Sequence, residues 1–347
     1  MPNNAAVVHK GVVAVLGLLC AAFVSAQDAT PERVRNKAVV VRYMNSLNTP
    51  DHGAVAKEVV ASGYRESRGE FANLARNAAG SQLAKLSRPL GAAIPDRSNP
   101  ILQVIGEGNL VAVQYRIKGT HKANLYGIPS TGKSIDIDAV ALFRLEGGRI
   151  IEGWFMADEA GLLRQLGTPM PARSDGKRLA ASAGEARPGQ EVLTELLAHP
   201  IDSQEYRNKV MVAAYKSAHP PAGILPASGS PFGNISRHGF TNLAAIGTEI
   251  GQGDKSTPQA FPGRVDKIEH LLAEGNHVVM QFQITGTNSK SLYGLPPSNG
   301  PVAAYEFSIM TFQGGTWTDA WFFGDDLGML QQVGGPPEFW FSGKAAP

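Results

Sequence analysis

The stretch that decides the fold is residues 143–167, which read FRLEGGRIIEGWFMADEAGLLRQLG. Apolar and polar residues alternate on both sides of Gly147-Gly148, which predicts two antiparallel strands, Ser134–Leu145 and Arg149–Asp158. Adjacent glycines at the joint supply the positive φ angles of a primed hairpin turn. We therefore expect a β-hairpin followed by a helix that begins after Asp158.

The same pattern returns near the end of the chain, where residues 310–334 read MTFQGGTWTDAWFFGDDLGMLQQVG. Further motifs recur in the same order: Arg35-Asn36-Lys37 with Arg207-Asn208-Lys209, Phe71-Ala72-Asn73 with Phe240-Thr241-Asn242, Glu107-Gly108-Asn109 with Glu274-Gly275-Asn276, and Leu125-Tyr126-Gly127 with Leu292-Tyr293-Gly294. Chance would not keep this order, so the sequence indicates a duplicated domain. We expect domains at 31–171 and 191–341, joined by a solvated linker at 172–190.

Each copy places helical patterns before strand patterns. Apolar residues have helical spacing in Val34–Leu47, and Asp51–Ala61 and Phe71–Leu86 predict two further helices. From Ile101 onward the period changes to two, and Leu110–His121 alternates as an antiparallel strand. Helices followed by consecutive strands are typical of an α+β domain.

Charge and cysteine content narrow the possible partners. The chain has 32 Lys and Arg against 30 Asp and Glu, without a basic block or an aromatic-basic ladder, which argues against nucleic acid. Cys20 is its single cysteine. If residues 1–26 are removed, the mature chain can form no disulfide and no thiolate metal site. A small molecule is the partner we expect.

Residues 1–26 have the pattern of a signal peptide. Lys10 precedes an apolar run, Gly11–Val24, and small residues at Val24-Ser25-Ala26 predict cleavage before Gln27. The run is shorter than the roughly 20 apolar residues that span a bilayer. We expect a secreted or periplasmic protein without membrane contact after cleavage; a retained anchor is the alternative.

Register within the first hairpin predicts which side chains share a face. With Gly147-Gly148 as the turn, Phe143 lies opposite Glu152 and Ala141 opposite Trp154. Trp154, Met156 and Asp158 then share one face by the two-residue period.

An indole, a thioether and a carboxylate on one half-buried face describe an apolar pocket with a charged group at its rim. Desolvation there would raise the pKa of Asp158 and suit it to acid/base work. The alternative is that Asp158 caps the helix beginning at Glu159, since Asp is a favoured N-cap residue.

His121 ends its predicted strand in register with Tyr115. It could orient a carboxylate or move a proton; the alternative is a hydrogen-bonded structural residue. Asp136 and Asp138 alternate with isoleucines and are expected on the solvent face. No histidine joins their spacing, so we expect no metal site.

The region Glu107–Gly167 resembles the C-terminal half of SnoaL-like ester cyclases and polyketide cyclases, which have the nuclear transport factor 2-like fold. The resemblance rests on Gly119-Thr120-His121, the loop Tyr126–Lys133, the strand ending in Trp154, and Asp158 before Leu162–Gly167. It implies two cone-shaped domains, each a curved antiparallel sheet wrapped around helices and an apolar cavity.

The resemblance also implies chemistry. Family cyclases close a ring by an intramolecular aldol step without metal or cofactor, and a cavity carboxylate takes the proton. Asp158 matches that carboxylate, with His121 or Tyr126 as donors to the developing oxyanion. The pocket residues expected in the two copies are Trp154, Met156, Tyr126, Phe143 and Tyr115, and Trp321, Asp325 and Tyr293.

Both copies depart from the family pattern, and the departures of the second copy favour the first copy as the active one. The aromatic-x-x-His step found in many members is Tyr64-Arg65-Glu66-Ser67 here, without a histidine. The Thr-His step becomes Thr287-Asn288 in the second copy.

Two functions remain open. One is a cofactor-independent cyclase or isomerase acting on a hydrophobic carbonyl compound. The other is non-catalytic binding or transport of a small apolar ligand. In both cases we expect the copies to associate as an intramolecular pseudo-dimer, because fusion raises the effective concentration of one for the other.

Overall fold

A computed structural model describes residues 31–79, 85, 87–169, 186–226, 236–240 and 257–335. The predicted signal peptide and most of the predicted linker lie outside the described residues. Among the described residues, no helix has the length and apolar character needed to cross a membrane.

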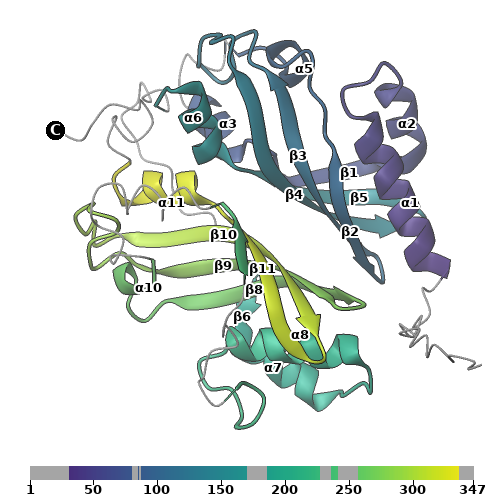
Figure 1. Ribbon diagram of the computed structural model, residues 1–347, viewed down its shortest axis with the longest axis vertical. Helices are drawn as coiled ribbons and strands as arrows, with labels where there is room; N and C mark the ends of the chain where they lie inside the picture. Colours follow the sequence, from purple (N-terminus) through teal and green to yellow (C-terminus); the bar gives the residue numbers. More distant parts are fainter. Residues whose placement is uncertain are drawn as a thin grey trace, which may run out of the picture.

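The first domain places a five-stranded sheet against helices (Figure 1). Its sheet has the order β1-β5-β4-β3-β2, with β1 parallel to β5 and the other neighbours antiparallel. The elements are α1 Pro31–Ser46, α2 His52–Val59, β1 Val60–Arg68, α3 Ala72–Ala79, α5 Leu90–Ala93, β2 Ile101–Glu107, β3 Leu110–Thr120, β4 Ser134–Glu146, β5 Arg149–Ala157 and α6 Glu159–Leu166. The predicted strands are confirmed, whereas β1 was not expected.

The second domain repeats this arrangement with one extra strand. Its sheet has the order β6-β8-β9-β10-β11-β7. The elements are β6 Arg187–Pro188, α7 Gly189–Ala198, α8 Gln204–Tyr215, β7 Ser236–Gly239, α10 Thr257–Ala260, β8 Val265–Glu274, β9 His277–Thr287, β10 Pro301–Gln313, β11 Thr316–Gly324 and α11 Asp326–Val333. Because β6 pairs with β8 and α7 starts at Gly189, the second domain begins inside the predicted linker.

The hairpin that decides the fold forms as predicted, with one difference in register. Gly147 and Gly148 have φ angles of 54° and 75°, as a primed turn requires. A register shift between Arg144 and Leu145 places Leu142, not Ala141, opposite Trp154. The predicted pairing beyond the turn is therefore wrong by one residue, because a bulge inserts an extra residue into one strand.

The two sheets pack face to face through the sides that point away from their helices (Figure 1). Trp154 and Met156 belong to this contact, and a place for them in a ligand pocket stays a prediction. Both faces of β5 are buried, and the period-two pattern alone does not tell which face meets the cavity. The buried side chains of the contact are Ile105, Ala112, Val140, Leu142, Trp154 and Met156 with Leu272, Val279, Phe307, Ile309 and Phe323.

Reciprocal polar contacts frame this apolar interface. Glu107 accepts hydrogen bonds from Lys209 Nζ (2.5 Å) and from the backbone nitrogen of Ala273 (2.6 Å). Its counterpart Glu274 accepts from Lys37 Nζ (2.7 Å) and from the backbone nitrogen of Gly106 (2.7 Å). In both directions, the glutamate of one copy accepts from a lysine and a backbone nitrogen of the other copy. Such reciprocal contacts are typical of an interface with twofold symmetry.

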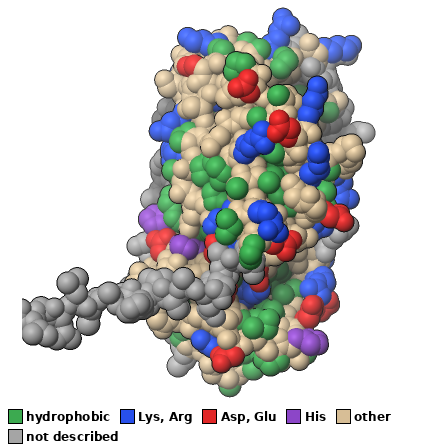
Figure 2. Space-filling view, turned by 90° about the vertical axis from the view of Figure 1, so that its right-hand side faces the viewer, with side chains coloured by type: hydrophobic (Ala, Val, Ile, Leu, Met, Phe, Trp, Pro, Cys, Tyr) green, Lys and Arg blue, Asp and Glu red, His purple; other side chains and the backbone are tan. Residues whose placement is uncertain are grey.

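The cores of the two domains also meet where α6 contacts α11. One continuous cluster contains Leu162 and Leu166 of α6 together with Leu327 and Leu330 of α11. The cores of the two domains are therefore continuous at this point, because both helices bury their apolar side chains against each other. On the face shown in Figure 2, cationic and anionic side chains are interspersed, in keeping with the small net charge.

Candidate functional site

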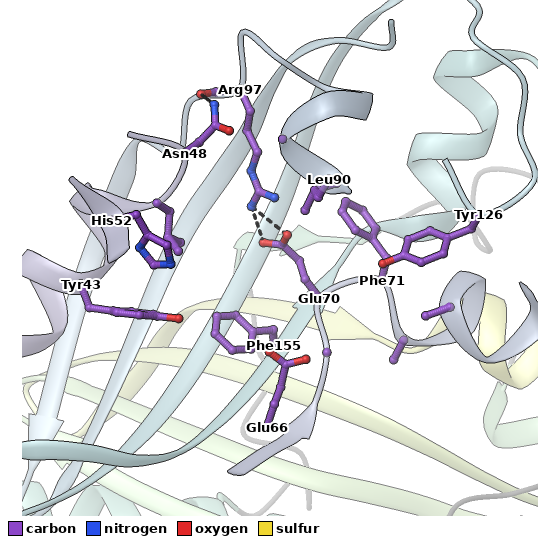
Figure 3. A pocket seen from close by; sticks show the side chains of 15 residues that line it. Tyr43, Asn48, His52, Glu66, Glu70, Phe71, Leu90, Arg97, Tyr126 and Phe155 are labelled. Atoms are coloured by element: carbon purple, nitrogen blue, oxygen red, sulfur yellow. Dashed lines mark hydrogen bonds and ion pairs between the residues drawn. The ribbon is translucent and has the colours of Figure 1, made fainter. Parts of the chain in front are cut away.

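The first domain contains a cavity of about 340 Å³ that opens between its helices and the sheet. Its lining combines aromatic rings with charged and polar groups, which Figure 3 shows converging from several elements. The main side chains are Tyr43, Leu47, Asn48, His52, Glu66, Glu70, Phe71, Leu90, Arg97, Tyr126 and Phe155. A space of this size lies within the range of small-molecule sites.

Glu70 is fixed at the centre of the lining. Arg97 Nη2 lies 2.7 Å from Glu70 Oε2 and 2.8 Å from Oε1, and the buried Tyr115 hydroxyl donates to Oε1. Arg97 Nε also donates to Asn99 (2.8 Å). Because the side chains of Arg97 and Glu70 are 7% and 12% exposed, this pair is held rigidly in a low-dielectric setting.

Glu66 lies at the mouth of the same cavity without a side-chain hydrogen bond or ion pair among the described residues (Figure 3). Partial burial, and then repulsion from Glu70, raise the pKa of Glu66 above its ordinary value. Its side chain remains exposed enough to meet a ligand. A carboxylate with a raised pKa and free oxygens can accept a proton from a bound compound.

Three further side chains can donate or accept protons in the cavity. Burial, followed by the charges of Glu66 and Glu70, raises the pKa of Tyr43, so it stays a neutral donor. Burial likewise raises the pKa of Tyr126. Ser46 Oγ donates to the Tyr43 carbonyl (2.7 Å) and lies 3.0 Å from His52 Nδ1. Because the hydroxyl proton of Ser46 is used in its bond to the Tyr43 carbonyl, Nδ1 of His52 is the donor in the contact with Ser46 Oγ.

Tyr126 lines the cavity, and its backbone is unusual. It has a φ of 50°, which is uncommon for a residue with a side chain. The turn around it is held by the Ser87 hydroxyl, which accepts from the Tyr126 nitrogen (3.0 Å), and by mutual backbone bonds of Leu125 and Ile128. Tyr293 has the same conformation (φ 45°), so the strained turn is common to both copies.

Asp158 does not line this cavity. Its Oδ1 accepts from the backbone nitrogen of Gly161 (2.7 Å), and its side chain caps α6. The structure thus shows the capping role that was the alternative interpretation. A catalytic role for Asp158 stays a prediction.

His121 is fully buried and holds a loop. Its Nδ1 lies 3.1 Å from Thr131 Oγ1 and accepts from the Thr131 nitrogen (3.3 Å), and burial lowers its pKa. In the second copy Asn288 Oδ1 accepts from the Ser298 nitrogen (2.7 Å) in the same loop. Because asparagine accepts the corresponding hydrogen bond there, the contacts of His121 agree with the interpretation that it is a hydrogen-bonded structural residue.

The remaining predicted pocket residues have different places. Tyr115 contacts the cavity lining through its hydrogen bond to Glu70. Phe143 lies behind the lining residues, and its ring centroid is 5.7 Å from that of Tyr43 and 5.3 Å from that of Phe155. Tyr293 is buried in the core. Trp321 stacks on His238 with ring centroids 4.8 Å apart.

Asp325 joins a buried polar cluster between the domains. It caps α11, forms an ion pair with Arg68 (3.1 Å) and accepts from Asn73 Nδ2 (2.5 Å). Glu159 accepts from the same Asn73 nitrogen (2.5 Å) and from the Leu74 nitrogen (2.9 Å). Burial, and then the charge of Asp325, raise the pKa of Glu159 to about 7.

The second copy lacks the cavity carboxylates. Alignment on Ser67-Arg68 and Ser236-Arg237 places Ile235 at the position of Glu66 and Gly239 at that of Glu70. Phe282 replaces Tyr115. The carboxylates of this site therefore belong to the first copy alone.

Sequence reasoning missed Glu66, Glu70, Arg97 and His52. Glu66 falls in the segment where the family has its histidine step. A comparison of the copies position by position would have marked Glu66 and Glu70 as ionisable residues that the second copy does not keep.

Fold and site together define a duplicated α+β protein with an acid/base cavity in its first copy. The chain belongs to the SnoaL-like polyketide cyclase family, whose model matches residues 37–166 and 255–333. None of the curated proteins searched matches the chain significantly.

Solved structures of single domains resemble this chain at low identity. A proposed SnoaL-like polyketide cyclase from Jannaschia sp. CCS1 is 24% identical over 40% of this chain and 96% of its own (TM-score 0.33). TsrD from Streptomyces laurentii is 21% identical over 40% and 98% (TM-score 0.31). A SnoaL-like polyketide cyclase from Agrobacterium tumefaciens is 18% identical over 38% and 97% (TM-score 0.30).

Proposed function

We propose that the first domain is a cofactor-independent acid/base catalyst for a small, largely apolar carbonyl compound, and that Glu66 is its base. The observation that carries this proposal is a carboxylate of raised pKa with free oxygens at the mouth of an aromatic cavity. We retain export of the protein as a prediction from residues 1–26.

The proposed step is a proton transfer. A carbon–hydrogen bond beside the carbonyl breaks, the proton goes to Glu66, and the electron pair forms an enolate. The neutral hydroxyls of Tyr43 and Tyr126 line the same cavity and would donate to the enolate oxygen; such donors act strongly in a site shielded from water. The enolate carbon then attacks a second carbonyl of the same molecule, and the alkoxide that forms takes the proton from Glu66. In a conjugated compound the dienolate instead takes the proton from Glu66 at another carbon.

A general-base probe tests this proposal without knowledge of the natural substrate. Removal of one ring proton from 5-nitrobenzisoxazole opens the ring to a coloured phenolate, so the full chain should accelerate this reaction. Glu66→Gln should lower kcat/KM by about 10²-fold or more, the usual contribution of a positioned base. Because the pKa of Glu66 is raised, activity should increase with pH across a range above that of an ordinary glutamate.

Glu58→Gln is the matched control, since Glu58 is an exposed glutamate of the same domain that pairs with Arg42. It should leave the rate unchanged. Unchanged activity in Glu66→Gln would refute the assignment of the base. Binding of the probe without any acceleration would favour the alternative function, a carrier of small apolar ligands.

A further inference from the structure

A second hollow lies in the second domain, outside the site described above. It occupies about 310 Å³ where the start of α7, the end of α8 and the start of β8 meet. Gly189 allows this close approach, since a Cβ there would lie 2.2 Å from the Lys216 carbonyl oxygen. We call this hollow the α7–α8 groove; its polar walls are Gln190, Lys216, Arg264 and Asp266.

The groove contains two cations for one carboxylate. Lys216 Nζ lies 2.8 Å and Arg264 Nη2 lies 3.2 Å from the same oxygen, Oδ2 of Asp266. The side chains of Lys216 and Asp266 are 4% and 9% exposed, and that of Arg264 is 26% exposed. The groove therefore holds one positive charge in excess, partly shielded from water, where charge attracts an anion more strongly.

Comparison with the first copy shows how this excess arises. Arg97, the counterpart of Arg264, is neutralised by Glu70. The second copy has glycine at the position of Glu70, and among the described residues the Arg264 guanidinium contacts Asp266 alone. Lys216 stands where the first copy has Met44, and Asp266 stands where it has Asn99. The second copy therefore has one cation and one anion more than the first copy here, and it has no carboxylate at the position of Glu70.

Neutral groups complete the groove. Gln190 Oε1 accepts from the Ser217 hydroxyl and from the His219 nitrogen (3.1 Å), and its Nε2 makes no hydrogen bond to the part of the chain that the structure describes. Tyr215 and the 45% exposed Val265 add apolar surface. We propose that the α7–α8 groove binds a small organic carboxylate, whose anionic group meets Arg264 and Lys216 while its apolar body lies on Tyr215 and Val265.

Titration of the full chain with benzoate, followed by calorimetry, tests this proposal, and benzamide is the uncharged control ligand. Benzoate should bind and benzamide should bind at least about tenfold more weakly, the usual effect of losing one charged hydrogen bond. Arg264→Gln should weaken benzoate binding by a similar factor. Asp266→Asn removes the competing carboxylate and should strengthen it.

Arg207→Gln is the matched control, because Arg207 is an exposed arginine of α8 that pairs with Asp202. It should leave benzoate binding unchanged. If Asp266→Asn does not fold, the double variant Lys216→Met with Asp266→Asn restores the residues of the first copy and should still bind benzoate through Arg264. Equal binding of benzoate and benzamide, or benzoate binding insensitive to Arg264→Gln in a folded protein, would overturn the proposal.

Discussion

The side-chain amide of Asn73, in the first domain, donates a 2.5 Å hydrogen bond to Oδ1 of Asp325, in the second. Both side chains are buried, so this bond is made in the absence of competing water. The same amide nitrogen donates to Glu159, and two carboxylates therefore share one donor at the meeting point of the domains. Such a cluster makes the contact between the domains sensitive to protonation.

The pKa of Glu159, raised to about 7, predicts that the protein loses stability as pH rises toward neutrality. An unfolded glutamate titrates near about 4.3, so between these values the folded state binds more protons than the unfolded state. The contribution of Glu159 to the free energy of unfolding is thus complete below about pH 4.3 and falls by a few kcal/mol up to about pH 7.

Urea unfolding at several pH values, with Glu159→Gln as the comparison, measures this contribution. The variant cannot ionise at this position. Its free energy of unfolding should therefore decline less between about pH 5 and 8 than that of the unmodified protein. Glu58→Gln, an exposed control, should follow the unmodified protein. Parallel curves for the protein and Glu159→Gln would contradict the raised pKa.

The helix caps of the two copies should differ in their importance for stability. Asp158→Ala removes a cap and should cost about 0.5–2 kcal/mol. Asp325→Ala should cost more, about 3–5 kcal/mol, because it also leaves Arg68 buried without its ion-pair partner. Denaturant unfolding gives both values, and Asp158→Asn adds a test of catalysis with the benzisoxazole probe. Loss of turnover in a stable Asp158→Asn protein would restore Asp158 as the base.

The reciprocal contacts across the sheet interface predict matched effects in the two copies. Glu107→Ala and Glu274→Ala each remove an acceptor for one lysine and one backbone N–H group of the other domain. Each should lower the free energy of unfolding by about 1–3 kcal/mol. Glu58→Ala is the control and should change it by less than about 0.5 kcal/mol. A large difference between the two interface variants would show that the interface is asymmetric in energy.

His121→Asn should be tolerated, because asparagine holds the same loop in the second copy. His121→Ala lacks the acceptor for Thr131 and should cost about 1–3 kcal/mol. Thermal unfolding of both variants separates the two cases. Should His121→Asn instead stop turnover of the probe while leaving the melting temperature unchanged, the histidine would have a chemical role.

The duplication, the α+β class and the hairpins could be predicted because they depend on local signals. Gly147-Gly148 and the alternation around them are read within a few residues. The face of β5 could not be predicted in the same way. Trp154 and Phe155 are both buried, one against the second domain and the other beside the cavity, so apolar character fails to distinguish them.

The cavity carboxylates were harder still to predict. Glu66 lies on β1, which pairs in parallel with β5, and Glu66 stands beside Gly153 although they are far apart in sequence. Parallel pairing leaves no turn motif to reveal it. Arg97 lies in the connection between α5 and β2, and His52 is the first residue of α2, so periodic spacing carries little information about either residue. The family motif instead drew attention to Asp158, which caps a helix here.

Fusion of the two copies has a consequence for how this protein could diverge. In a dimer of identical chains every substitution occurs twice, so a change that removes a carboxylate from one cavity removes it from both. Here one copy has Glu70 and the other has Gly239 at the corresponding position. The peptide link also fixes the stoichiometry at one of each kind, and no assembly step can pair two altered halves. Every molecule therefore contains one copy with Glu70 and one copy with Gly239, independent of any association equilibrium.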